Sequence, residues 1–223
     1  SFECFNEVCS IGSTEISGGD AVLDGSFPQC VNGKVLAKAD GFVTGETIVS
    51  TNEGGNVNVI LDRLYEVDAR VVLAGRDVAS LSNEPVAVIH FTSDRHSAAL
   101  VYPEQTSVSL SEGLYEVSAQ VFSGSSLTIP SSSRRECVSV PKKGLLGVFG
   151  GTSEECFNVE IPSTTLDNAL SGGGKNQILI LEDDLRVSNR VVIDVPSLPS
   201  PLSLDQLQQN YELFELQAVE VRF

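Results

Sequence analysis

Apolar and polar residues alternate along most of this chain, most regularly in VSLSEGLYEVSAQVF over residues 108–122. Two apolar residues of one parity precede Glu112 and Gly113, and the alternation then resumes from Tyr115 to Val121. Successive side chains of a strand point to opposite faces. The pattern therefore predicts a hairpin with one buried and one solvent-exposed face.

Similar segments recur at short intervals, and Gly, Asn and Asp separate them. They lie at 31–39, 46–51, 56–61, 65–73, 85–91, 97–102, 177–182, 190–195 and 218–223. Short strands at this spacing are typical of β-sandwiches and barrels. We therefore expect a mainly β fold of tandem, small, antiparallel β-sandwich modules.

The last third of the chain has two helix signals. Hydroxyl residues at 163–165 precede LDNAL, and glycines follow it at 172–174, which predicts a short helix with a cap at each end. In the second signal, Ser203 and Gln206 match a capping box ahead of an apolar stripe. With the strands around them, these helices predict a C-terminal α+β element packed on the sandwiches.

A loose internal repeat suggests where the modules divide. SEGLYEVSAQVF resembles DGSFPQCVNGKVLAKADGF, because in both an acidic residue and a glycine precede an alternating strand. We expect one β module at 1–64, a second at 65–140 and the α+β element at 141–223. The first module is expected to lack its opening strand, which favours a fragment of a larger precursor.

One stretch also has a family resemblance. Lys38-Ala39-Asp40-Gly41-Phe42, followed by the strand pattern of 57–61, resembles the closing half of carboxypeptidase regulatory-like or PEGA-type modules, and 114–117 echoes the same signature. Such modules are small transthyretin-like β-sandwiches, usually non-catalytic and often strung along bacterial and archaeal surface proteins. The resemblance implies a non-catalytic role at a prokaryotic, possibly archaeal, cell surface.

Charge narrows the classes of partner. The net charge is -16, from 30 acidic and 14 basic residues, so the surface repels nucleic acid and anionic membranes. The longest candidate for a membrane span, QILIL at 177–181, ends at Glu182-Asp183-Asp184 and is far shorter than the roughly 18 residues that span a bilayer. We expect no nucleic-acid partner and no direct membrane insertion of this segment.

Five cysteines stand outside any CxxC spacing, which favours disulfides and an oxidising, extracellular setting over zinc or redox sites. Cys137 and Cys156 lie in matched contexts, ECVSVP and ECFNVEIP, so one bridge is expected to join two strands there. In the N-terminal trio we favour Cys9 with Cys30, which leaves Cys4 unpaired or available to another chain. Buried free thiols are the alternative.

The sequence offers no catalytic constellation. No serine lies in a GxSxG turn, and SGGGKNQ at 171–177 is predicted to follow a helix rather than open one, the reverse of a phosphate loop. His90, Asp94 and His96 could hold a metal ion only if their side chains converged. A strand histidine and a surface histidine are the alternative interpretation.

Carboxylate clusters are the remaining metal candidates. Glu182, Asp183 and Asp184, and separately Asp20 with Asp24, could supply oxygen ligands to calcium, although neither set has a calcium-loop spacing. A solvated acidic turn is the alternative. No other cofactor is expected.

The sequence KKGLLGVFGG contains an apolar set that something must cover: Leu145, Leu146, Val148 and Phe149. We expect it to pack on a neighbouring sheet or to form an interface. Self-assembly or binding of another protein is therefore expected through the 144–151 loop or through sheet edges.

Together these features predict a non-catalytic, extracellular structural protein, such as a surface-layer, stalk, filament or adhesin segment. The alternative is a carbohydrate- or calcium-binding accessory module of a larger secreted protein. The absence of Trp and the presence of only four Tyr weigh against sugar stacking. A hydrolase would need a nucleophile and base that converge in the fold.

Overall fold

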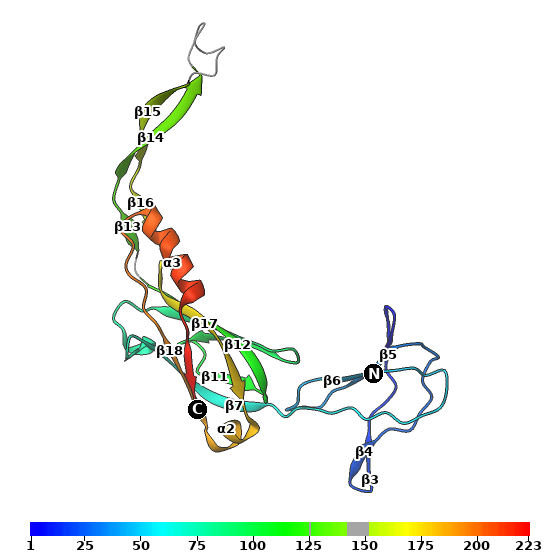
Figure 1. Ribbon diagram of the computed structural model, residues 1–223. Coiled ribbons are helices and arrows are strands. Elements are labelled where there is room, and N and C mark those ends of the chain that lie inside the picture. Colours follow the sequence, from blue (N-terminus) through cyan, green and yellow to red (C-terminus); the bar gives the residue numbers. More distant parts are fainter. Residues whose placement is uncertain (125, 142–151) are drawn as a thin grey trace.

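The computed structural model describes residues 1–124, 126–141 and 152–223, and it is mainly β, as the alternation predicts. From residue 65 onward, most of the chain builds a two-layer β-sandwich. A smaller β unit at 1–64 is joined to the sandwich by an extended segment, and a long two-stranded ribbon projects from another part of it (Figure 1).

Each layer of the sandwich is a sheet of non-consecutive strands. The first has the order β10 (Ser97–Tyr102), β9 (Val86–Thr92), β12 (Gly113–Phe122), β17 (Leu170–Ile180). The second has the order β11 (Ser107–Leu110), β7 (Tyr65–Leu73), β18 (Arg190–Val195), β19 (Glu220–Arg222), with β8 (Arg76–Asp77) beside β7. A short 3-10 helix, η1, spans Val78–Ser80. Among the described pairings only β7 with β18 is parallel.

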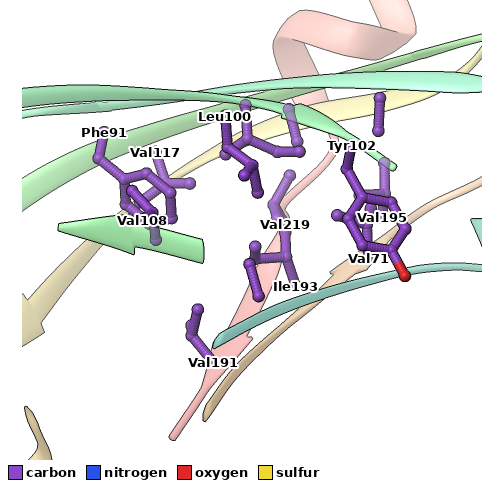
Figure 2. Packing of buried hydrophobic residues seen from close by; sticks show 14 of the residues in the cluster. Val71, Phe91, Leu100, Tyr102, Val108, Val117, Val191, Ile193, Val195 and Val219 are labelled. Atoms are coloured by element: carbon purple, nitrogen blue, oxygen red, sulfur yellow. The ribbon is translucent and has the colours of Figure 1, made fainter. Parts of the chain in front are cut away.

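The alternating positions form the core between the two sheets (Figure 2). Tyr115, Val117, Ala119 and Val121 of β12 are fully buried, whereas Glu116 between them is exposed. The inward residues of β7, β9 and β18 belong to the same cluster. The hydrophobic effect of this burial is what joins segments distant in the sequence.

The hairpin predicted at 108–122 is wrong, although its buried positions are right. β11 pairs with β7 in one sheet, whereas β12 pairs with β9 and β17 in the other. The chain crosses between the layers at Ser111 to Gly113, where the buried Tyr115 hydroxyl lies 2.9 Å from the Ser111 hydroxyl. The parity of a strand fixes which face is buried but not which strand lies beside it.

The predicted boundary at 140/141 also needs correction. It falls inside a paired ribbon, and β17, β18 and β19 complete the same two sheets as β7, β9 and β12. The expected second module and the expected α+β element therefore share one core.

Two α-helices occur in the described chain, α2 (Glu182–Val187) and α3 (Leu204–Leu216). The prediction of α3 is confirmed, and the Ser203 hydroxyl accepts a hydrogen bond from the Gln206 amide at 3.2 Å. The helix predicted after 163–165 is wrong, because this stretch forms β16 (Thr164–Leu166) and the glycines lie inside β17.

Gly173 and Gly174 have no side chain because α3 and its C-terminal end pack directly on β17 at these positions. A Cβ at Gly173 would lie 2.6 Å from Cδ2 of Phe214, and one at Gly174 would lie 2.6 Å from the carbonyl oxygen of Gln217. Lys175 adds an ion pair to Glu215 at 2.8 Å.

The unit at 1–64 contains a four-stranded antiparallel sheet in the order β2 (Glu7–Cys9), β1 (Phe2–Cys4), β5 (Gly33–Ala37), β6 (Gly45–Val49). A separate hairpin pairs β3 (Glu15–Ser17) with β4 (Asp20–Val22). Residues 56–61 alternate in burial, as predicted, but form no described strand. Arg95 of the sandwich forms an ion pair with Asp62 at 2.7 Å.

The disulfide of this unit joins Cys4 to Cys30, and Cys9 is the free thiol. The prediction that Cys9 bonds to Cys30 and that Cys4 is unpaired is therefore wrong. Cys9 lies on β2, the edge strand of the sheet, directly opposite Phe2 of β1. Strand pairing, rather than separation along the chain, decides which of two nearby cysteines meets Cys30.

Candidate functional site

The ribbon that leaves the sandwich consists of β14 (Ser132–Pro141) and β15 (Thr152–Ile161), and we call these two strands the arm. The register is continuous from the pair Ser132–Ile161 to the pair Pro141–Thr152. The two strands pair with each other and with no further described strand, so each leaves one backbone edge open. Ten residues of extended strand are about 30 Å long.

A second, smaller apolar cluster lies where β12 ends and β17 begins, next to the segments that lead into the arm. β13 (Leu127–Ile129) pairs with β16 and continues the ribbon toward the body (Figure 1). Near them Leu170, Leu198 and Phe214 are buried together, with Phe122 packed against them. The segments that lead into the arm therefore start beside a packed cluster that includes Phe214 of α3.

Beyond this base no described element covers the arm. All residues at 132–139 and 154–160 are exposed. An isolated two-stranded ribbon is marginally stable in water. The Cys137–Cys156 disulfide, whose Cα atoms lie 4.0 Å apart, links the two strands at directly opposed positions, and it joins the pair that the matched contexts predict.

The two faces of the arm differ in chemistry. Because opposed residues share a face, Val138, Phe157 and Val159 lie on one side and Arg135 with the disulfide on the other. The three apolar side chains are 44%, 50% and 39% exposed, and they form, with Val140 and Ile161, what we call the apolar face. This alternation is the same as in the core strands, yet it faces solvent.

Three charges lie on the apolar face among these side chains. Arg134 is level with Val159, Glu136 with Phe157, and Glu155 with Val138. Nε of Arg134 is 3.3 Å from Oε1 of Glu136, and both side chains are largely exposed. Such an exposed pair contributes little stability.

The apolar set predicted as an interface, Leu145, Leu146, Val148 and Phe149, lies outside the described residues. In the sequence it belongs to the segment between β14 and β15.

The predicted metal candidates do not come together in the described part of the chain. His90 is an exposed residue of β9, whereas Nε2 of His96 lies 2.9 Å from the carbonyl oxygen of Ser109. No group of three or more His, Cys, Asp or Glu side chains that could hold a metal ion occurs among the described residues.

The acidic cluster at 182–184 forms the first turn of α2. Glu182 accepts a hydrogen bond from the Tyr65 hydroxyl, which raises the pKa of that tyrosine, and Asp184 accepts one from the Leu181 amide at 3.3 Å. Acidic side chains at this end interact favourably with the helix dipole. Asp20 lies on β4 and Asp24 in the loop that follows.

A polar hollow of about 390 Å³ lies beside β7, between Asp68, Arg70, Asp77, Tyr102 and Arg190. Its central carboxylate is already engaged. Asp77 accepts from Nε of Arg70 at 2.8 Å and from the Tyr102 hydroxyl at 2.9 Å. Burial, together with this hydrogen bond, raises the pKa of Tyr102 to about 12. These contacts fasten η1 and β8 to the sandwich.

Comparisons with family models, with curated proteins and with solved structures found no match to this chain. The resemblance to carboxypeptidase regulatory-like modules therefore stays a prediction. In the described residues, no helix is long and apolar enough to cross a membrane.

Proposed function

We propose that this chain is a non-catalytic structural protein of an extracellular assembly, and that the arm is the surface through which it joins its neighbours. The observation that carries the proposal is the apolar face of the arm, which projects into solvent with no described layer against it. A structural role is consistent with the family resemblance in 38–61.

The position of the apolar side chains supports a contact role. Single exposed apolar residues are ordinary on any protein. Here they occupy consecutive levels of one face of a thin ribbon, whereas the opposite face carries Arg135, Asn158 and the disulfide. Contiguous apolar surface with polar surroundings is typical of an interaction site.

The cross-link supports both the contact role and the location. A ribbon that must bind as a rigid unit loses less conformational freedom on binding if it is already linked. Two disulfides, of which Cys137–Cys156 is solvent-exposed, are typical of proteins in oxidising compartments. We therefore place the protein at the cell surface or outside the cell.

Light scattering and electron microscopy of the disulfide-intact protein test the proposal. We expect species larger than one chain that grow with concentration, and we expect Phe157→Thr to reduce them. Threonine removes the ring and, as a β-branched residue, remains favourable in a strand. The matched control is Leu179→Thr, since Leu179 is also an exposed strand residue, 63% accessible, but lies on β17 of the sandwich.

Equal assembly of the wild type and Phe157→Thr would refute the proposal, as would a protein that stays monomeric at every concentration. Equal loss in both threonine variants would show that general surface hydrophobicity, rather than the arm, drives the association.

A further inference from the structure

We infer that the arms of two copies of this chain pack against each other, apolar face to apolar face and in opposite directions, about a twofold axis through the Glu136–Phe157 level. This inference rests on the proposed function and names the partner of the arm. It follows from the order of residues along the apolar face.

The order of residues on this face is self-complementary. From base to tip, three successive levels are Arg134 with Val159, Glu136 with Phe157, and Val138 with Glu155. When one arm is reversed about the middle level, the first level of each copy meets the third level of the other. Arg134 then lies at the same height along the arm as Glu155 of the other copy, but opposite the strand next to it. Val159 and the other copy's Val138 are placed in the same way.

The same reversal continues at the ends of the face. Ile161 lies at the base and Val140 near the tip, so each falls at the level of the other in the reversed copy. At the centre the two Phe157 side chains come together, and the two Glu136 carboxylates, each paired with Arg134 of its own chain, meet as well. A surface that must match itself in a twofold interface requires this kind of pairing, in which position i meets j and j meets i.

Arg134 can serve two carboxylates in this arrangement. The guanidinium of Arg134 uses Nε for Glu136 of its own chain, and a guanidinium has further N–H donors for a second carboxylate. Each twofold pair of arms thus forms two Arg134–Glu155 contacts between chains. Complementary charge fixes the register and direction of an interface more than its strength.

The net charge of the chain favours opposite over parallel arms. With a charge of -16 on each chain, the two bodies repel each other. Arms of about 30 Å that overlap in opposite directions hold the bodies apart by more than the Debye length of about 8 Å at physiological salt. Parallel arms would bring the bodies side by side.

Sedimentation equilibrium of the full, disulfide-intact chain tests the inference with a charge-exchange set. We expect Arg134→Glu and Glu155→Arg each to weaken dimerisation by about 10-fold or more, because each creates two like-charge contacts. The double variant R134E/E155R should recover most of the wild-type affinity. Arg135→Glu is the control, since it makes the same charge change on the opposite face and should leave dimerisation unchanged.

Each other outcome overturns the inference. If the double variant associates no better than the single variants, or if Arg135→Glu weakens association as much as Arg134→Glu, the arms do not pack in this way. A wild-type protein without a dimer overturns it as well. If Phe157→Thr still reduces assembly while the charge exchange gives no recovery, the arm remains the contact surface but binds another site. If Phe157→Thr has no effect, the proposed function itself fails.

Discussion

Removal of the arm disulfide is expected to loosen the arm while leaving the sandwich intact. In the Cys137→Ser/Cys156→Ser variant the two strands keep their ladder of hydrogen bonds but lose the link between directly opposed positions. The linked cysteines are 19 residues apart. Closing a loop of that length in the unfolded chain corresponds to about 3 kcal/mol of stabilisation in the chain-entropy treatment.

The loss concerns the arm alone because no described layer packs on it. About 3 kcal/mol corresponds to a roughly 100-fold change in an equilibrium constant. We therefore expect the protection of the amides of β14 and β15 against hydrogen exchange to fall by up to about 100-fold. Amides of β12 and β17, which lie in the buried core, should keep theirs.

Amide hydrogen exchange read by mass spectrometry on peptides from the arm and the sandwich measures both effects. The matched control is Cys4→Ser/Cys30→Ser, which removes the disulfide of the unit at 1–64 and should leave exchange in the arm unchanged. Unchanged protection in the arm after loss of its own disulfide would show that the bridge does not hold the two strands together. An equal loss in β12 and β17 would contradict the prediction as well, because the arm would then be part of the cooperative core.

Four further outcomes follow from the structure. Gly173→Val should lower the melting temperature and expose α3 to proteolysis, because its side chain would overlap Phe214; normal proteolytic resistance would contradict the packing. Ser203→Ala should cost about 1 kcal/mol in chemical denaturation by removing the cap of α3, and an unchanged midpoint would argue against that cap. Thiol titration of the unreduced protein should label one cysteine, Cys9, whereas labelling at Cys4 would contradict the observed pairing. The pKa of Tyr102, about 12, lies above its ordinary value of 10.0, so the contribution of its hydroxyl to stability is complete below pH 10 and is lost as the pH rises toward 12. The denaturation midpoints of wild type and Tyr102→Phe should therefore converge over that pH range. Midpoints that stay equally far apart would contradict this expectation.

The parity of apolar residues predicted most buried positions of the sandwich, because a strand with one buried face must alternate. It did not predict strand partners. Val108 and Val117 belong to one core but to different sheets, and the pattern in the sequence is the same for a hairpin and for a crossing between layers. Similarly, three glycines after an apolar segment are typical of a helix end, whereas here the need for glycine at 173 and 174 comes from α3 and the residue after it, about forty residues later in the chain, and at 172 from Leu73 and Pro196.

The sequence predicted the two strands of the candidate site and their disulfide, but not their exposure to solvent. The matched contexts of Cys137 and Cys156 predicted two strands and their bridge. They could not indicate that these strands leave the body, because Val138 and Phe157 alternate with polar residues just as core residues do. Whether such a face is covered depends on the number of neighbouring strands, which is a property of the whole fold.

Light scattering of the disulfide-intact protein over a concentration series, with wild type, Phe157→Thr and Leu179→Thr side by side, shows whether the chains associate through the arm. If the arm is the contact surface of a structural subunit, the mass of the wild type and of Leu179→Thr should rise with concentration, and that of Phe157→Thr should stay near 23.7 kDa. A mass that does not change with concentration in any of the three, or that rises equally in all of them, would contradict the account.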